Sequence, residues 1–288
     1  MKILSLFSRS FLTPAWTFTP EGTIWRLFPA ESGELIGEAR NQDSKKVTFF
    51  ALDSETGTPL WQNLSFDEPW WIGIEDVTQN VLLLHKFGSP DMPQHRSIIA
   101  VDLRSGEYLW SNEELTFWFA WNGSVYAHKM MYEARVASEL DARTGRILRE
   151  ISGASEASLV QIREQAVNSK RKDLQFPETI VTDDAALTLG AVIGKNVPAK
   201  ETEGPLEFIH VDGFTVMSFH VRATASDESA HLLDNHLKIV DGESGRVVYS
   251  EIIVRGSPAT APDSFFVRNR TVYYIKEQKT LTAVSLLK

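Results

Sequence analysis

One pattern occurs four times in this chain and restricts its fold more than any other feature. Each copy has an aspartate, two further residues, a serine or threonine and then a glycine, with Leu or Val before the aspartate and again three residues after the glycine. The copies are Ala51–Trp61, Ala100–Trp110, Glu139–Arg149 and Ile239–Tyr249. At ordinary residue frequencies this five-residue core should occur roughly 0.1 times in such a chain. The four copies are therefore an internal repeat.

The repeat predicts a strand, a tight turn and a second strand. The aspartate can accept a hydrogen bond from a backbone N–H two residues further on, which starts a turn. The glycine can adopt the left-handed conformation that lets the chain reverse. Apolar residues on both sides have the composition of strands. Each copy is therefore expected to be the hairpin between two antiparallel strands.

Two of the copies resemble the repeat of the quinoprotein-like (PQQ-like) β-propellers. In that family the third strand of a blade runs into Ala-Leu-Asp-x-x-Thr-Gly and the outer strand closes with Leu/Val-Trp, as in Asp53–Trp61 and Asp102–Trp110. The other two copies have Arg149 and Tyr249 in place of the Trp. Residues 265–276 are also similar to uncharacterised bacterial single-domain propellers. The resemblance implies an all-β propeller fold.

The spacing of the copies predicts the number of blades. Their glycines, at positions 57, 106, 145 and 245, are 49, 39 and 100 residues apart. A blade of four short strands needs about 40–50 residues. The long gap therefore predicts a degenerate blade within residues 152–204, where Ser158–Lys172 is either a helical insertion or an irregular strand. We expect one domain of residues 1–288 with about six four-stranded blades, five or seven being the alternatives.

The two ends of the chain predict how the propeller closes. Residues 281–288 align with the third strand of the repeat, with Val284 in the place of Val101, and the outer strand of that blade is missing. The alternation in Lys2–Phe7 predicts a strand before the first blade. We expect this N-terminal strand to pair with the C-terminal blade, because closure removes the exposed edges of a sheet protein.

Basic residues follow the apolar part of several predicted strands, one hairpin before the repeat motif. Repetition predicts that they lie at matching heights around one axis, where a ring of His and Lys could bind a carboxylate or phosphate. The alternative is that they are ordinary polar strand ends that contact water. The candidate binding residues are His85, Lys86, His128, Lys129, His220 and Lys276, with Arg40 and Lys195 as weaker copies.

Sequence motifs of catalysis and metal binding are not found. There is no His-Glu-x-x-His and no Gly-x-Ser-x-Gly, and Gly190–Asn196 departs from the phosphate-binding P-loop in its spacing and its last residue. His231 and His236 are interpreted as part of a polar hairpin loop. The adjacent Glu75 and Asp76 should splay apart on a strand as surface charge. We predict no catalytic residue and no metal site.

The resemblance also raises the question of a cofactor. The quinoprotein enzymes are usually eight-bladed and exported, bind pyrroloquinoline quinone with calcium, and often carry a vicinal cysteine pair. This chain has no cysteine and is too short for eight blades of ~45 residues each. We therefore predict no cofactor.

Composition restricts the partners. The formal net charge is −9, and the basic cluster Lys170–Lys172 is interpreted as a solvated loop, so nucleic acid is not an expected partner. No apolar run approaches the ~20 residues of a membrane span. Polar residues interrupt the N-terminal segment, unlike a signal peptide. Together with the lack of cysteine, this predicts a cytoplasmic bacterial protein that does not bind membranes.

These observations favour a non-catalytic binding or scaffold propeller, whose ligand is an anionic small molecule or a protein. The alternative is a hydrolase or lyase with its site in the mouth of the central channel. Four tryptophans bear on the choice between these two functions. If they lie between blades, they belong to the core; if they are exposed together, they would form a partner surface or a sugar-binding mouth. They are Trp70, Trp71, Trp118 and Trp121.

Overall fold

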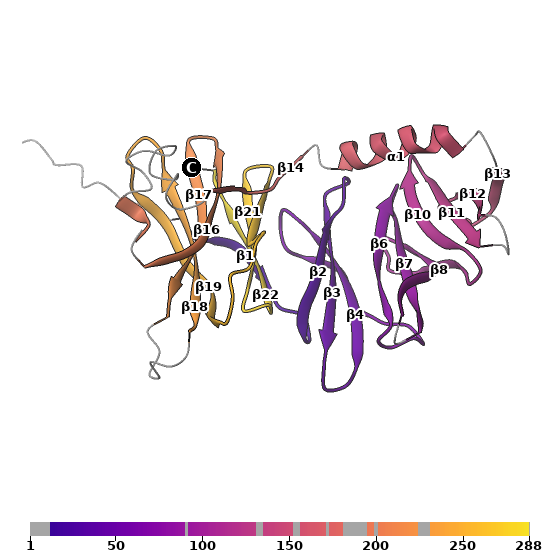
Figure 1. Ribbon diagram of the computed structural model, residues 1–288, viewed down its shortest axis with the longest axis horizontal. Helices are drawn as coiled ribbons and strands as arrows, with labels where there is room; N and C mark the ends of the chain where they lie inside the picture. The colour runs from indigo at the N-terminus through magenta and orange to yellow at the C-terminus, as the bar shows by residue number, and fades with distance from the viewer. Residues whose placement is uncertain are drawn as a thin grey trace, which may run out of the picture. The chain divides into compact units, whose positions relative to one another are not determined.

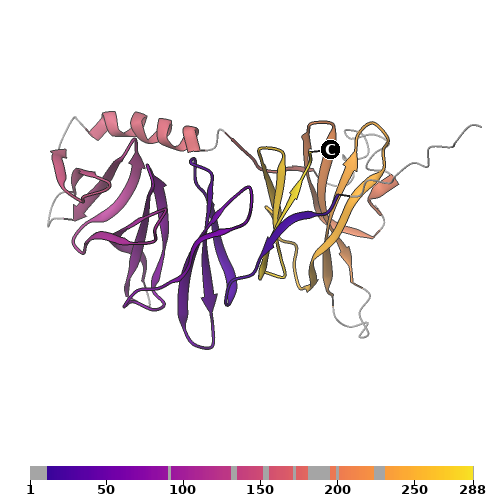
Figure 2. The ribbon, with the colours of Figure 1, turned by 180° about the vertical axis from the view of Figure 1, so that it is seen from behind.

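The computed structural model describes most of the chain, and the described part is nearly all β. The described residues are 12–89, 92–130, 135–151, 156–170, 173–180, 195–198, 201–223 and 231–287. They fall into two compact units, one of residues 20–173 and one that combines residues 1–19 with residues 174–288 (Figures 1 and 2). No helix of this described part is long and apolar enough to span a membrane.

The unit of residues 20–173 contains three antiparallel meanders of four strands. A single parallel bridge, Thr116↔Ser97, links the second meander to the third. The first consists of β2 (Thr23–Pro29), β3 (Glu34–Asn41), β4 (Lys46–Asp53) and β5 (Pro59–Leu64). The second consists of β6 (Ile72–Thr78), β7 (Val81–Ser89), β8 (Met92–Asp102) and β9 (Tyr108–Asn112). The third consists of β10 (Thr116–Trp121), β11 (Ser124–Met130), β12 (Arg135–Asp141) and β13 (Ile147–Ile151), and is followed by α1 (Glu156–Lys170).

The other unit contains two five-stranded antiparallel sheets. One has the order β15 (Glu178–Ile180), β16 (Thr202–Val211), β17 (Phe214–Arg222), β18 (Leu233–Asp241) and β19 (Val247–Ser257). The other has the order β14 (Leu174–Gln175), β20 (Phe265–Arg268), β21 (Thr271–Lys276), β22 (Thr280–Ser285) and β1 (Pro14–Phe18). An N-terminal strand thus pairs with the C-terminal sheet as predicted, but it is residues 14–18; the predicted strand Lys2–Phe7 lies outside the described residues.

The segment predicted to hold a degenerate blade has a different structure where it is described. Residues 156–170 form the helix α1, so the helical alternative for this stretch is confirmed. The short strands β14 and β15 extend the edges of two sheets instead of forming a sheet of their own. Residues 181–194 lie outside the described residues. The closed ring, the count of about six blades and the single domain therefore stay predictions.

The predicted turns are confirmed in all four copies of the repeat. Each aspartate accepts hydrogen bonds from backbone N–H groups two or three residues further on, such as Thr56 N to Asp53 Oδ1 at 2.8 Å and Thr144 N to Asp141 Oδ1 at 2.8 Å. The glycine of each copy has a positive φ, from 66° to 73°. The hydrogen bonds from Thr56 and Thr144 stabilise the carboxylates and hold the pKa of Asp53 and Asp141 below its usual value.

A second backbone contact recurs in every sheet. The first strand of each repeat is β2, β6, β10, β16 or β20. Counted from it, the residue after the end of the third strand donates its N–H to the carbonyl of the hairpin turn between the first and second strands, at 2.7–3.2 Å. The fifth copy is in the tail, which confirms the predicted alignment of residues 281–288 with the repeat. The five donor–acceptor pairs are Ser54–Gly33, Leu103–Asn80, Ala142–Gly123, Gly242–Gly213 and Leu286–Arg270.

The tryptophans of the repeat attach one sheet to the turn of the next. Trp61 Nε1 donates to the carbonyl of Leu103 at 2.7 Å, and Trp110 Nε1 donates to that of Ala142 at 2.9 Å. Each ring also covers the turn glycine of the next sheet, Gly106 or Gly145. A side chain there would collide with the ring, so the glycine has a packing role as well as a conformational one.

The copies without tryptophan have other partners. Arg149 donates to Glu139 within its own sheet at 2.6 Å, and α1 follows that sheet where another sheet would otherwise come. Tyr249 shares a hydrogen bond with Tyr274 between hydroxyl oxygens 2.7 Å apart. In the two copies that lack the Trp, the residue in its place therefore has a different hydrogen-bond partner from that of Trp61 and Trp110.

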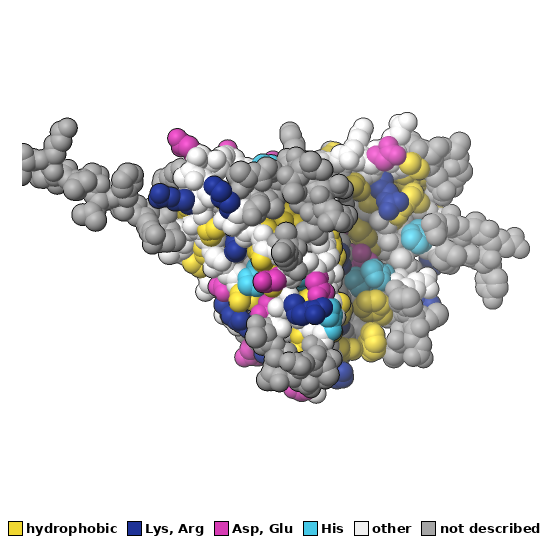
Figure 3. Space-filling view, turned by 60° about the vertical axis from the view of Figure 1, so that its left-hand side comes forward, with side chains coloured by type: hydrophobic (Ala, Val, Ile, Leu, Met, Phe, Trp, Pro, Cys, Tyr) yellow, Lys and Arg dark blue, Asp and Glu magenta, His cyan; other side chains and the backbone are white. Residues whose placement is uncertain are grey.

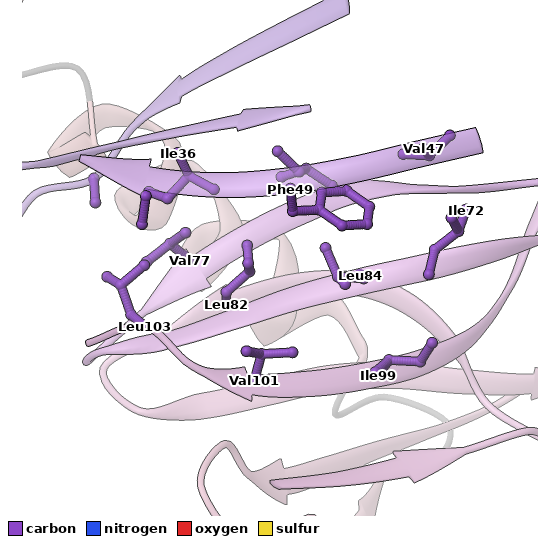
Figure 4. Close-up of a cluster of buried hydrophobic side chains, with 13 residues drawn as sticks. Ile36, Val47, Phe49, Ile72, Val77, Leu82, Leu84, Ile99, Val101 and Leu103 are labelled. Carbon is purple, nitrogen blue, oxygen red and sulfur yellow. The ribbon is translucent and has the colours of Figure 1, made fainter. Parts of the chain in front are cut away.

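The core lies between successive sheets. Figure 4 shows side chains of β3 and β4, among them Ile36 and Phe49, packed against Leu82 and Leu84 of β7. Phe49 is fully buried, and a buried side chain of this size stabilises the fold by about 1.5–3 kcal/mol. Trp70 packs against this cluster, and Trp118 and Trp121 pack against another that includes residues of α1.

The tryptophan contact leads to a test with two turn glycines. A Cβ at Gly145 would lie 2.5 Å from the Trp110 ring at φ +69°, whereas one at Gly245 would meet nothing within 4 Å at φ +66°. We expect Gly245→Ala to cost about 1 kcal/mol for the left-handed backbone alone. Gly145→Ala should cost about 3 kcal/mol, because overpacking against a rigid ring adds to that strain. Urea unfolding of both variants measures the difference, and equal costs would contradict the docking role of Trp110.

Candidate functional site

The register of the sheets shows how the predicted basic residues relate to one another. The third strand's last residue pairs with the first residue of the second strand in each sheet, for example Asp102 with Val81 and Asp141 with Ser124. His85 lies four residues after Val81, and His128 lies four residues after Ser124, so these two histidines occupy the same position along their strands. His220 lies two residues further along its strand. Matching heights are therefore found for some of the predicted groups and not for all.

The lysines occupy the next position, which points to the opposite face of the sheet. Lys86 Nζ lies 2.7 Å from Glu113 Oε1, Lys129 forms an ion pair with Glu114, and Lys276 Nζ lies 3.1 Å from Glu251 Oε1. The hydrogen bond from Lys86 lowers the pKa of Glu113. Glutamates thus already accompany these lysines, and the anion site proposed at the strand ends stays a prediction.

His220 is buried in the sheet β15–β19 and acts there as a hydrogen-bond acceptor. Its side chain is 4% exposed, and its Nε2 accepts a hydrogen bond from the backbone N–H of Ala261 at 3.2 Å. Burial, and secondarily His236, lowers its pKa from 6.5. The neutral ring is the form that can accept this bond.

His85 is the centre of a polar cluster in the sheet β6–β9. Its Nδ1 lies 3.3 Å from Glu75 Oε1, and His95 Nδ1 lies 2.7 Å from the same oxygen. The two imidazoles stack with their centroids 3.6 Å apart, and Phe87 contacts both rings edge-on. Among the described residues these three groups are the ones arranged closely enough to share a metal ion.

A buried ion pair of the neighbouring sheet faces β6. Glu38 is 1% exposed and accepts a hydrogen bond from Arg40 Nε at 2.6 Å. Arg40 also donates to the carbonyls of Trp70 and Ile72 at 3.1 and 2.9 Å. These bonds satisfy the guanidinium group. Arg40, predicted as a weaker candidate for binding an anion, therefore links two sheets instead.

A pocket of about 280 Å³ lies beside the end of α1. Its wall comes from the first hairpin turns of all three sheets of this unit, at Ser32, Asn80 and Asn122. The Oδ1 of Asn80 is buried and has no hydrogen-bond partner. Most of the residues that line the pocket are polar. The complete lining is Glu31, Ser32, Val77, Thr78, Gln79, Asn80, Ala120, Trp121, Asn122 and Lys170.

The charged groups at the pocket have polar partners. Lys170 forms an ion pair with Asp76, and Ser169 donates a hydrogen bond to Glu31 at 2.6 Å. Burial raises the pKa of Asp76, although Lys170 acts in the opposite direction. The pocket therefore presents amide, hydroxyl and indole groups and the Glu31 carboxylate to a ligand, while its ammonium group is already paired.

Two sequence interpretations are corrected at these sites. Glu75 and Asp76 do splay apart, towards the histidines and towards Lys170, but Asp76 is 8% exposed and neither residue is surface charge. Lys170 ends α1 and contacts Asp76 instead of belonging to a solvated loop. The separation of 94 residues explains why the sequence showed no sign of this pair.

Comparison with known proteins finds weak similarities. A family model described as "Domain of unknown function (DUF4905)" matches residues 29–110. A search of curated proteins finds no significant match. Solved structures resemble this chain with 10% identity: BamB from Moraxella catarrhalis (TM-score 0.30, 96% of this chain and 98% of that one) and the Cps50 (Swd1) β-propeller domain from Myceliophteria thermophila (0.33, 96% and 100%). A europium-containing methanol dehydrogenase is similar over 93% of this chain but 52% of its own (TM-score 0.31, 10% identity).

His220 leads to a prediction of pH dependence. Its pKa is lowered in the folded state, so the unfolded chain binds the proton more tightly. Its contribution to stability is complete above pH 6.5 and is lost as the pH falls below this unfolded value. Urea unfolding at pH 7.5 and 5.5 should show a smaller fall in stability for His220→Gln than for the unchanged chain. The same substitution at the exposed His210 is the control, and an equal fall in all three proteins would contradict the prediction.

Proposed function

We propose that this chain is a non-catalytic binding protein with the architecture of a closed β-propeller. Five antiparallel sheets that share one backbone contact support this architecture, as do the tryptophans that dock on the following turn. The pattern is that of repeated blades, each stabilised by the next one. The proposed ligand site is the pocket beside α1.

The buried oxygen of Asn80 carries the proposal. A buried carbonyl oxygen without a partner costs free energy, and a ligand that donates a hydrogen bond to it after rotation of the Asn80 amide would recover that cost. Asn80 lies in the wall of a pocket whose other groups are mostly polar. This arrangement of a few polar groups around a concave site is typical of small-molecule binding.

The lining favours a small neutral molecule rich in hydroxyl groups, such as a monosaccharide. Amides and hydroxyls such as Asn122 and Thr78 can exchange hydrogen bonds with sugar hydroxyls, and Trp121 offers an apolar ring surface. Lys170 is neutralised by Asp76, so an anion would gain little there. The volume of about 280 Å³ is at the small end of ligand pockets.

The other ligands expected from the sequence are weaker proposals. An anion at the strand ends would compete with glutamates for Lys86, Lys129 and Lys276. On the face in Figure 3, basic side chains are interspersed with acidic ones, and the net charge of −9 does not favour nucleic acid. A protein partner is compatible with the scaffold, but no contact among the described residues identifies its surface.

The test uses a variant that preserves the backbone. Asn80 has φ 64°, a conformation that glycine adopts without strain, so Asn80→Gly removes the amide and keeps the turn. Arg270 has φ 62° at the same turn position in the C-terminal sheet, so Arg270→Gly is the matched control. We expect a monosaccharide from a panel of neutral sugars, citrate and phosphate to bind in calorimetry. Asn80→Gly should weaken this binding at least tenfold, the effect of about 1.4 kcal/mol, and Arg270→Gly should not change it.

Other results would overturn the proposal. Binding of citrate or phosphate alone, lost in Lys86→Met with Lys129→Met, would place the ligand at the strand ends instead. Release of nitrophenol from nitrophenyl glycosides would favour the hydrolase alternative. Binding that Asn80→Gly and Arg270→Gly affect equally would exclude the pocket.

A further inference from the structure

Three potential metal ligands converge in the sheet β6–β9, apart from the proposed sugar pocket. They are Nδ1 of His85 on β7, Nδ1 of His95 on β8 and the carboxylate of Glu75 on β6, and their ligand atoms all lie within 4.8 Å of one another. Three adjacent strands supply one ligand each. Such a rigid platform holds the groups close together without an ordered loop.

Irregularities of the strands create this convergence. The register shifts between Ile74 and Asp76 opposite β7, which releases Glu75 from the regular pairing. It shifts again between β7 and β8 beyond Leu84, where Ser97 has φ 61°. Bulges commonly re-aim side chains next to functional sites. Here they bring Glu75 and His95 to the same side as His85.

The state of His85 is the second observation that points to a ligand. The residue is 2% exposed, and neither ring nitrogen has a hydrogen-bond partner, because the 3.3 Å approach to Glu75 does not have hydrogen-bond geometry. A buried imidazole without partners is costly. A metal ion bound to a ring nitrogen would supply the missing partner.

Gly73 lies against the His85 ring. A Cβ at Gly73 would come within 3.0 Å of the His85 ring and 3.2 Å of Glu38 Oε2, so the glycine leaves the ring uncrowded on this side. The nearby cations are already engaged: Arg40 pairs with Glu38 at 2.6 Å, and Arg26 donates to the carbonyl of Ile74 at 2.5 Å. Each guanidinium group therefore has an acceptor of its own.

We propose that Glu75, His85 and His95 form a binding site for a first-row divalent transition metal, with zinc as the best-suited ion. Two imidazoles and one carboxylate are a ligand set that Zn²⁺ uses when it keeps an open position for water or substrate. The stacked rings must tilt so that both Nδ1 lone pairs point at the ion. His95 has the room for this movement because its side chain is 40% exposed.

The test is zinc binding by the full chain after removal of metal with a chelator. Calorimetry with ZnCl₂ should show one ion per chain. Glu75→Gln and His95→Gln should each weaken binding at least tenfold, since each removes one of three ligands. Zinc should also raise the melting temperature of the unchanged chain more than that of either variant. Both residues are partly exposed, so the variants retain the fold, which circular dichroism verifies.

Two controls distinguish this site from surface binding. His210→Gln changes an exposed histidine whose Nδ1 lies 2.9 Å from Thr215, and it should leave zinc affinity unchanged. His231→Gln removes an exposed histidine paired with Glu203 at 2.7 Å, where an ion could bind adventitiously. Zinc binding that is lost in His231→Gln but kept in Glu75→Gln would overturn the proposal. So would the absence of stoichiometric binding of Zn²⁺, Co²⁺ and Ni²⁺.

Discussion

The hydrogen bond between the end of each third strand and the turn between the first two strands is the contact on which the structure depends. It joins two hairpins of a sheet at the same end, and it recurs in all five sheets at 2.7–3.2 Å. This contact holds one end of each sheet together. It thereby positions the aspartate turn, the tryptophan contact to the next sheet and the polar pocket. The turns of three sheets contribute to the pocket wall, so the proposed ligand site is built from the part of each sheet that this contact holds.

The sequence predicted the parts of the fold that depend on local chemistry. The aspartate turns, their left-handed glycines and the tail strand with Val284 were all predicted correctly, because neighbouring residues determine them. The pairing of an N-terminal strand with the last sheet was also predicted, though on residues too close to the terminus. The helix remained an open alternative, because its apolar residues do not form a clear stripe and its packing against the preceding sheet is tertiary.

The candidate sites were predicted less well than the fold. His85 was recognised from its repeated position, but its neighbours Glu75 and His95 were not, because two register shifts decide that they meet. A regular strand pattern would have sent Glu75 elsewhere. The ion pair between Asp76 and Lys170 depends on the packing of α1, which a repeat analysis cannot show. The repeat therefore predicted the scaffold, whereas the candidate sites depend on local irregularities that the repeat does not contain.

The pairing of β1 with β22 has a consequence for synthesis on the ribosome. Every strand of residues 20–173 finds its partners within that segment, so this unit is complete once residue 173 has been made. β1 is made before it, yet its partner follows roughly 270 residues later in the chain. Such a distant pairing forms late, since the intervening chain must first be ordered. β1 is thus translated before the unit of residues 20–173 and incorporated after it, and until then the edge of β22 is open to other strands.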